Sequence, residues 1–311
     1  MTEHNVEEKD GGARLDRWFK RHYPQFTHGL LEKALRKGDV RLAGKKAKAS
    51  DRVEAGQAIT IRCPIPDVRE KAPKPEARKL SPEDIIMMQQ AVLYKNADVI
   101  VINKPPGLAV QDGTKVVKSV DGMLDALRFE SSERPRLVHR LDRDTSGVLV
   151  LARTSRAATR LMHAFADKTA EKLYWALVKG TPEIAEGTID LPLAKQEEGD
   201  VEKVAIDEED GKRAVTLYRV VDKLSSTLAW VELQPVTGRT HQLRVHMAAI
   251  GHPIIGDGKY GGREAFVDGM ELSRKLHLHA RRIVVPDMLD VTAPLPKHMR
   301  ESWKKLGLEE E

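Results

Sequence analysis

The sequence predicts an α+β protein in which a small basic domain precedes a larger domain built on a mixed, largely antiparallel sheet. Residues 172–178, 214–221 and 227–233 are rich in the β-branched and aromatic side chains that are typical of strands. The short gap between the last two segments favours a hairpin with antiparallel pairing. Residues 155–170 have the apolar spacing of an amphipathic helix, with Met162 on the face expected to be buried.

The small domain is predicted from a concentration of positive charge near the N-terminus. Residues 13–62 carry thirteen Lys/Arg against five Asp/Glu, a larger excess than the net +5 of the whole 311-residue chain. A charge concentrated in this way is typical of a module that binds a polyanion. Residues 1–12 are polar and acidic, and we expect them to form a flexible tail.

Two short helices and a basic hairpin are expected within the small domain. The apolar spacing of residues 15–23 predicts the first helix. Thr27 is expected to cap the second helix, Leu30 to lie in its buried stripe, and Gly38 to end it. Strands are then expected at residues 39–46 and 57–61.

A linker is expected between the two domains at residues 63–82, because five prolines lie there among charged residues. The second domain is therefore assigned to residues 83–311. Its first elements are expected to be a helix capped by Ser81, a strand at residues 98–103 and a helix at residues 119–129.

Composition excludes several classes of protein. The chain is 41% hydrophobic and 32% charged, which is typical of a globular protein. No apolar run approaches the ~18 residues that a membrane span requires, and the acidic first ten residues lack the apolar core of a secretory signal. Cys63 is the only cysteine, which excludes an internal disulfide and a multi-cysteine zinc site. We therefore expect a cytoplasmic protein without a membrane partner.

One charged loop stands out within apolar sequence, in the segment Leu137–Leu151. Arg140, Asp142, Arg143 and Asp144 place four charges within five residues, directly before a Val- and Leu-rich run typical of a buried strand. A carboxylate at the mouth of a buried strand is a candidate for chemistry. A salt-bridged turn explains the same residues equally well.

Four motifs together resemble the pseudouridine synthases that act on large-subunit ribosomal RNA. They are the segments Asn103–Leu108, His139–Gly147, Thr237–His246 and Gly251–Gly261. Within that family, the second motif is most similar to the synthase C branch. The resemblance extends over about residues 14–296, nearly the whole chain.

The resemblance implies isomerisation of uridine to pseudouridine in large-subunit (23S) ribosomal RNA. The N1–C1′ bond breaks, the base turns and C5 joins C1′, so no cofactor is needed and none is expected. Asp142 is implied as the catalytic carboxylate, which either attacks C1′ or takes the C2′ proton; both roles require its ionised form. Arg244 is implied as the ion-pair partner of Asp142. Tyr174 is implied to stack on the target uracil and is a candidate acceptor of the C5 proton.

A uridine within folded RNA must leave its base stack before it can react, and the resemblance assigns Arg140 to the vacated space. RNA contacts are also expected from Arg239, His241 and Gln242. The RNA is expected to be either free ribosomal RNA or part of an assembling large-subunit particle. Residues 13–62 resemble an S4 RNA-binding domain. Its expected phosphate contacts are Lys33, Arg36, Lys37, Arg41, Lys45, Lys46 and Lys48.

No metal site is expected, because the spacing of the histidines fits no zinc motif. They are interpreted as structural or RNA-contacting residues. The histidines in question are His241, His246, His252, His277 and His279.

Three alternatives to this function remain open from the sequence. The chain could be a non-catalytic RNA-binding or ribosome-assembly protein, or a synthase that acts on another RNA. It could also be a metal-dependent RNA hydrolase that uses Asp142 and Asp144, although Asp144 is better interpreted as a helper in the turn. A monomer is expected, because the sequence has no coiled-coil or dimerisation signature.

Overall fold

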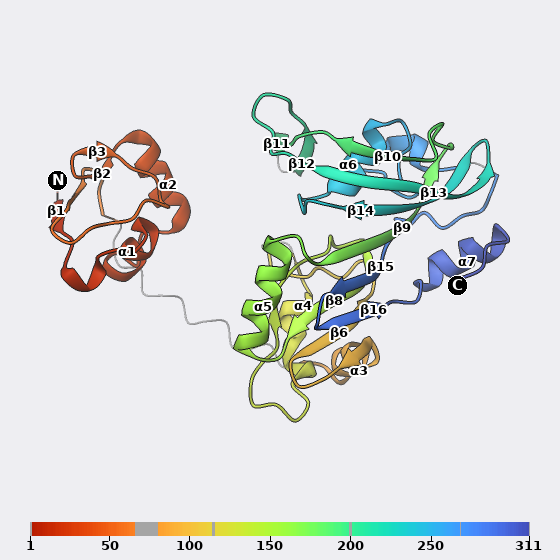
Figure 1. Ribbon diagram of the computed structural model, residues 1–311, viewed down its shortest axis with the longest axis horizontal. Coiled ribbons are helices and arrows are strands. Elements are labelled where there is room, and N and C mark those ends of the chain that lie inside the picture. The colour runs from red at the N-terminus through yellow and green to blue at the C-terminus, as the bar shows by residue number, and fades with distance from the viewer. Residues whose placement is uncertain (1, 66–79, 114–115, 199–200, 268, 311) are drawn as a thin grey trace. The chain divides into compact units, whose positions relative to one another are not determined.

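The computed structural model divides the chain into two compact units, residues 1–78 and 79–311 (Figure 1). Most of the linker predicted at residues 63–82 lies outside the described residues. No described helix has the length and apolar character needed to cross a membrane. The described residues are 2–65, 80–113, 116–198, 201–267 and 269–310.

The first unit has two helices and a four-stranded antiparallel sheet of order β1-β4-β2-β3, joined by one core that contains Trp18 and Phe19. Thr27 caps the second helix by accepting a hydrogen bond from the backbone N–H of Leu30, as predicted. Gly38 ends that helix in the left-handed conformation at φ 77°, also as predicted. The elements are β1 (Thr2–Asn5), α1 (Leu15–His22), α2 (His28–Lys37), β2 (Val40–Leu42), β3 (Lys45–Lys46) and β4 (Ala58–Ile61).

The prediction of a flexible tail at residues 1–12 is wrong. Strand β1 pairs with β4 from Thr2 to Asn5, and Val6 is buried in the core of the unit. Asp10 is also buried, and its carboxylate accepts hydrogen bonds from Arg21 and His22 of α1. The tail was predicted from its polar side chains. Strand pairing depends on backbone hydrogen bonds, which the side-chain pattern of this segment does not reveal.

The second unit is built on a ten-stranded mixed sheet of order β10-β13-β14-β9-β15-β8-β6-β5, with β16 beside β15 and β7 beside β8. Every pair is antiparallel except β8 with β15, so the predicted α+β class with a largely antiparallel sheet is confirmed. The hairpin predicted from residues 214–221 and 227–233 is also confirmed. The strands are β5 (Val92–Lys95), β6 (Val99–Lys104), β7 (Arg136–Leu137), β8 (Ser146–Ala152), β9 (Glu171–Lys179), β10 (Glu186–Asp190), β13 (Val215–Ser225), β14 (Leu228–Pro235), β15 (Leu278–Val285) and β16 (Leu289–Thr292).

Five α-helices and a separate two-stranded hairpin, β11 (Leu193–Glu198) with β12 (Val201–Ile206), complete the described part of this unit. The single helix predicted at residues 119–129 is instead the short α4 followed by a 3-10 turn at Leu124–Leu127. The helices are α3 (Pro82–Gln90), α4 (Val120–Met123), α5 (Ser155–Ala166), α6 (Gln242–Ala249) and α7 (Lys297–Lys305).

Two side chains predicted for buried helix faces are exposed. Leu30 of α2 is 45% exposed and Met162 of α5 is 50% exposed. Each directly precedes or follows a buried leucine, Leu31 or Leu161. Adjacent helical residues are about 100° apart around the axis, so only one of each pair can face the core.

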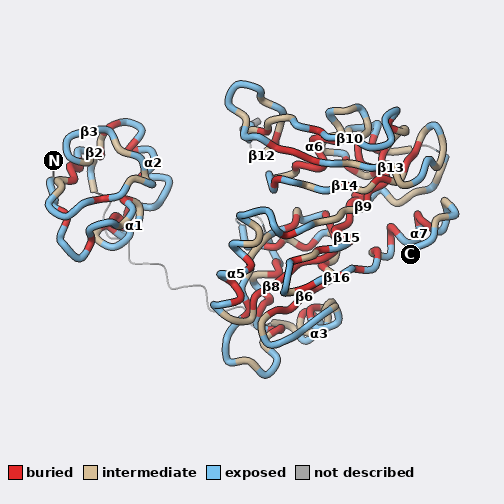
Figure 2. Tube along the Cα trace, viewed as in Figure 1, coloured by how far each residue is buried: buried red, intermediate tan, exposed pale blue. Residues whose placement is uncertain are grey.

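Strand β8 is the centre of the second unit, because all seven of its residues are buried (Figure 2). Leu149 and Leu151 belong to one core with α3 and α4, whereas Val148 and Val150 belong to another core with α5. Alternate residues of a strand point to opposite faces, so β8 is covered on both sides. The charged loop that precedes β8 is therefore attached to a strand that is buried over its whole length.

Gly147 sets the close approach of β8 to β15. Its φ is +112°, and a Cβ atom added there would lie 2.2 Å from the carbonyl oxygen of Ala280 on β15. Only glycine fits such a position without moving the neighbouring backbone. The start of β8, just after the charged loop, is held against β15 in this way.

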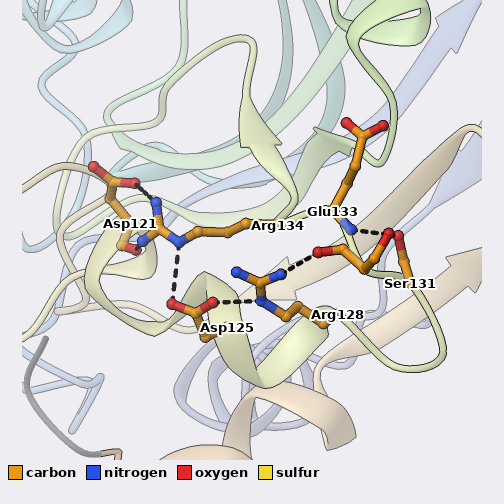
Figure 3. Close-up of polar contacts among 7 residues, drawn as sticks. Asp121, Asp125, Arg128, Ser131, Glu133 and Arg134 are labelled. Carbon is orange, nitrogen blue, oxygen red and sulfur yellow. Dashed lines mark hydrogen bonds and ion pairs between the residues drawn. The ribbon is translucent and has the colours of Figure 1, made fainter.

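An ion-pair network holds the segment that leads into this loop (Figure 3). Asp125 accepts hydrogen bonds from Arg128 Nε at 2.6 Å and from Arg134 Nε at 3.2 Å, and Arg134 also pairs with Asp121. Ser131 accepts a hydrogen bond from the backbone N–H of Glu133 at 3.1 Å. These contacts hold the chain against the region of α4 shortly before β7 begins. The members of the network are partly exposed, so it orders the loop more than it stabilises the fold.

Buried histidines belong to the core of the second unit. His279 lies 2.9 Å from Ser146 Oγ and donates from Nε2 to the carbonyl of Ala293 at 3.1 Å. His277 lies 2.8 Å from both Ser302 Oγ and the carbonyl oxygen of Lys275. Both ring nitrogens of each histidine are therefore occupied within the protein, which agrees with a structural role. Among the described residues, no three His, Cys, Asp or Glu side chains are grouped as metal ligands.

Acid is expected to destabilise the protein through His277 and His279. Burial lowers the pKa of each to about 4, whereas a histidine in the unfolded chain titrates near 6.5. Between these pH values the unfolded chain binds protons that the folded protein does not, so stability falls as the pH falls. Each histidine should cost about 2 kcal/mol at pH 5 relative to pH 7. Urea unfolding at pH 5, 6 and 7 measures this loss.

The substitution His279→Asn should reduce this pH dependence by about one proton. The matched control is His28→Asn, because the side chain of His28 is 67% exposed. A free energy of unfolding that stays constant between pH 7 and pH 5 would contradict the assignment of neutral core histidines.

Candidate active site

A cavity of about 670 Å³ lies beside the charged loop in the second unit. Three segments line it: the loop before β8, the chain from the end of α5 into β9, and the turn between β14 and α6. Asp142 is the one carboxylate residue among its described lining. The cationic residues of the lining are Arg140, Lys168, Lys172, Arg213 and Arg239.

Asp142 is held at the edge of this cavity by buried neighbours. Leu141 is packed in the core with β8, so the residue after it cannot move far from the strand. The Asp142 side chain is 19% exposed, and its Oδ1 lies 4.0 Å from Nε2 of His241. The accessible edge of this carboxylate can reach a molecule bound in the cavity.

Tyr174 of β9 lines the same cavity, so the structure brings the two residues together. Burial raises the pKa of the Tyr174 phenol above its usual range, and the negative charge of Asp142 raises it further. The phenol is therefore neutral at physiological pH. It offers an aromatic ring and a hydroxyl to whatever occupies the cavity.

His241 links Asp142 to a second motif. It precedes α6 in the left-handed conformation at φ 54°, and its Nδ1 lies 2.5 Å from the hydroxyl of Tyr260. That hydroxyl accepts a hydrogen bond from the backbone N–H of Val204, which leaves its proton for Nδ1. The neutral ring then carries its proton on Nε2, the atom that faces Asp142. Burial lowers the pKa of His241, although the charge of Asp142 opposes this shift.

The predicted ion pair between Arg244 and Asp142 is not the one observed. Arg244 is buried on α6, and its guanidinium donates two hydrogen bonds to Asp257, each at 2.7 Å. Two parallel hydrogen bonds satisfy a carboxylate better than one distant contact, so Asp257 holds the guanidinium. Burial lowers the pKa of Arg244, the hydrogen bonds and charge of Asp257 raise it, and the charge of Asp142 raises it further without an ion pair.

Lys104 fixes the backbone beneath the charged loop. The residue is fully buried, and its Nζ donates to three carbonyl oxygens: those of Pro105 and Leu108 at 2.9 Å and that of Arg143 at 3.0 Å. The first two belong to the turn after β6, and the third lies one residue beyond Asp142. Burial lowers the pKa of Lys104 to about 7, and the charges of Asp144 and Asp142 oppose the shift.

The other residues predicted near the active site differ in what they can contact. Arg140 is exposed and lines the cavity, as does Arg239, whose Nε donates to the carbonyl of Arg213. Gln242 does not fit the predicted RNA contact. Its amide oxygen accepts from Thr237 and Arg239, and its amide nitrogen donates to Val215 and Thr216. Both lone pairs and both protons of that amide are therefore used within the protein.

The basic residues predicted in the first unit are only partly grouped. Lys33, Arg36 and Lys46 line a depression of about 850 Å³, together with Lys48. Arg41 instead donates to the carbonyls of Gly38 and Gly44 in its own hairpin. Lys37 and Lys45 are exposed but do not line this depression.

Several residues of the site were not assigned from the sequence. Lys104, Asp257 and Tyr260 lie in motifs that carried the family resemblance, so their motif membership was a signal that could have been used. Lys168 and Lys172 carried no such signal, because isolated lysines near the end of a helix are common on protein surfaces.

Substitution of Lys104 by methionine is expected to destabilise the protein. The change leaves three buried carbonyl oxygens without their donor, which should lower the free energy of unfolding by roughly 2–4 kcal/mol. Urea unfolding compares Lys104→Met with Lys297→Met, a control on α7 whose side chain is 86% exposed. Equal stability of the two variants would show that the ammonium does not hold the loop.

Comparisons with known proteins identify the family of the chain. Residues 98–249 match the family model described as RNA pseudouridylate synthase. The chain is 36% identical over 283 residues to "Ribosomal large subunit pseudouridine synthase C" of Rickettsia conorii, covering 89% of this chain and 90% of the relative. It is 33% identical over 309 residues to the protein of the same name in Vibrio cholerae, covering 97% and 96%.

A solved structure agrees with these matches. The structure of "Human RNA Pseudouridylate Synthase Domain Containing 4" has a TM-score of 0.60 and 28% identity, covering 73% of this chain and 98% of that one. The hydrolase and non-catalytic alternatives are therefore set aside. The motifs around Asp142, Tyr174 and Arg244 lie within the matched residues 98–249, and the chain belongs to the RNA pseudouridine synthase family of isomerases.

Proposed function

We propose that this synthase modifies uridines in large-subunit ribosomal RNA and uses Asp142 as its catalytic carboxylate. The observation that carries the proposal is the position of Asp142, the single carboxylate residue of the described lining, in the same cavity as Tyr174 and five Lys or Arg residues. The names of the Rickettsia and Vibrio relatives support the choice of RNA. A cation-lined cavity is suited to a polyanionic substrate.

The ionised form of Asp142 acts at the ribose. Either the carboxylate attacks C1′ as uracil leaves, or it takes the C2′ proton; in both routes the N1–C1′ bond breaks first and a C5–C1′ bond forms later. The Nε2–H of His241 faces the carboxylate, and 4.0 Å separates Nε2 from Oδ1 of Asp142. The guanidinium of Arg244, which is hydrogen-bonded to Asp257, contributes a buried positive charge that acts on Asp142. In the last step the proton leaves C5 and N1 gains a proton, and in the second route Asp142 returns the C2′ proton, so the isomerisation is balanced without a cofactor.

Tyr174 and Arg140 handle the base. A uridine must leave its stack to reach a carboxylate that is only 19% exposed. The neutral ring of Tyr174 provides a face on which the uracil can stack, and its hydroxyl is a candidate acceptor for the C5 proton. Arg140 is exposed at the rim and is long enough to occupy the space that the base vacates.

The first unit is proposed to be an S4-type RNA-binding domain. Its two helices, basic hairpin and late strand occur in the predicted order. The depression that contains Lys33, Arg36, Lys46 and Lys48 is lined by five Lys or Arg residues, the fifth being Arg14, and by one acid, Glu32. Such a surface binds phosphates through release of counterions and adds affinity without sequence specificity.

Tritium release from large-subunit ribosomal RNA transcribed with [5-³H]uridine tests the activity and its catalytic residue. Formation of the C5–C1′ bond expels the label, so the intact protein should release it, also in EDTA. Asp142→Asn should lower the rate at least roughly 100-fold, because the amide can neither attack nor take a proton. RNA binding should be almost unchanged.

Asp144→Asn is the matched control, since Asp144 is an exposed carboxylate two residues away. It should keep most of the activity. Full activity of Asp142→Asn, or equal loss of activity and RNA binding, would contradict the assignment of the catalytic carboxylate. Release from transfer RNA but not from ribosomal RNA would overturn the proposed substrate and leave the mechanism intact.

The depression of the first unit is tested with paired charge changes. The combined variant Lys33→Gln, Arg36→Gln should bind RNA more weakly and reduce the slope of log K against log salt by about 1.5, with kcat unchanged. The combined control Arg17→Gln, Lys20→Gln removes the same charges from exposed positions outside the depression. Equal effects in both variants would mean that the domain attracts RNA only through its overall charge.

A further inference from the structure

Two lysines that line the active-site cavity have no anionic partner among the described residues. Neither Lys168 nor Lys172 makes a side-chain hydrogen bond or an ion pair with any residue that the structure describes, although both line the cavity. Two other cations of the lining are engaged within the protein: Arg213 pairs with Asp190, and Arg239 donates to a backbone carbonyl. The remaining cation, Arg140, is already assigned to the space that the base vacates, so Lys168 and Lys172 are the two cations of the lining without an assigned role.

Lys168 has a backbone conformation that lysine rarely adopts. It follows the end of α5 with φ at +60°, in the left-handed region. That position after a helix is usually taken by glycine, because a Cβ atom is unfavourable there. A non-glycine residue in this conformation is often retained because its side chain has a function. Here the side chain reaches the cavity.

Lys172 carries its charge in a place where charge is costly. It is half-buried, and the lining residues near it in the cavity include His139 and Phe165, whose rings are 4.5 Å apart. Burial lowers the pKa of Lys172, and the charge of Lys168 lowers it further. His139 supplies no negative charge, since it is neutral and accepts the backbone N–H of Val150 at 2.8 Å.

The position of Lys172 relative to Tyr174 indicates the kind of anion. Residues two apart on a strand lie on the same face about 6.6 Å apart, so Lys172 and Tyr174 face the cavity side by side. If the uracil stacks on Tyr174 and the ribose lies at Asp142, the phosphodiester next to that ribose lies within reach of a lysine one strand repeat away.

We propose that Lys168 and Lys172 form a binding site for one phosphodiester of the RNA strand that carries the target uridine. Two ammonium groups in the same cavity suit the two charged oxygens of a phosphate, and a bound phosphate would offset the repulsion between them. This inference rests on the proposed function, because it places the base on Tyr174 and the ribose at Asp142. It assigns to these two lysines the task of orienting the flipped nucleotide.

The first experiment combines stability with RNA binding in the full-length protein. Lys172→Met should weaken RNA binding roughly tenfold and reduce the salt slope by about 0.7–0.9. The same change should leave the urea midpoint equal or higher, since it removes a half-buried charge. Lys168→Gly should behave in the same way, because glycine accepts the left-handed conformation.

The matched control is Lys223→Met, which removes a lysine from an exposed position of β13 outside the cavity. It should change neither the affinity for RNA nor the stability. If Lys172→Met lowers stability and affinity together, Lys172 is a structural residue and the proposal fails.

The second experiment identifies the phosphate. A stem-loop with one mapped target uridine is prepared with single methylphosphonate linkages, each of which removes the charge of one phosphodiester. At one linkage beside the target, the intact protein should lose about tenfold in affinity, whereas the Lys168→Gly, Lys172→Met protein should lose almost nothing more. Independent losses at every linkage would overturn the proposal.

The two proposals can fail separately. Tritium release by the intact protein is measured first on ribosomal and transfer RNA, and the stem-loop is taken from whichever RNA is modified. Absence of release from ribosomal RNA overturns the proposed substrate alone. Normal release together with unchanged binding by the double variant overturns the phosphate site alone.

Discussion

The buried ammonium of Lys104 is the interaction on which the active-site architecture depends. Its three hydrogen bonds join the turn after β6 to the backbone at Arg143, so two motifs far apart in the sequence become one rigid piece. Asp142 lies one residue from that junction and four residues before β8, a strand buried on both faces. Because the backbone is fixed on both sides of Asp142, its carboxylate keeps a defined orientation while its oxygen atoms stay accessible. Chemistry on an extruded nucleotide requires both properties.

The electrostatics of the cavity follow from how its charges are partnered. Arg244 is satisfied by Asp257, so it provides positive charge near Asp142 without occupying its oxygen atoms. His241 presents a neutral N–H from the other side because Tyr260 holds its second nitrogen. The carboxylate of Asp142 therefore keeps an edge open to substrate. A direct bidentate arginine would stabilise the same charge but would compete with the ribose for those atoms.

The sequence was sufficient where local patterns decide structure. The cap at Thr27, the end of α2 at Gly38 and the hairpin of β13 with β14 all follow from neighbouring residues. It was insufficient where partners come from distant segments. Strand β1 forms because its backbone hydrogen-bonds to β4. Arg244 pairs with Asp257, which lies thirteen positions later in the sequence, beyond the end of α6. The assignment of Asp142, Tyr174 and Arg244 came from the family resemblance, since periodicity alone left Asp142 as an ordinary turn residue and Tyr174 as an ordinary core aromatic.

The cations of the cavity show how binding and stability oppose each other in this enzyme. Lys172 is half-buried without an acidic partner among the described residues, and Lys168 adopts a conformation better suited to glycine; each lowers the stability of the free protein. Selection for stability alone would replace both residues. Their presence is explained if the missing partner is the substrate, because a bound phosphate neutralises the charges. The stability that the two lysines cost the free protein is then recovered as affinity for RNA. It is recovered only when a nucleotide lies in the cavity with its ribose at Asp142.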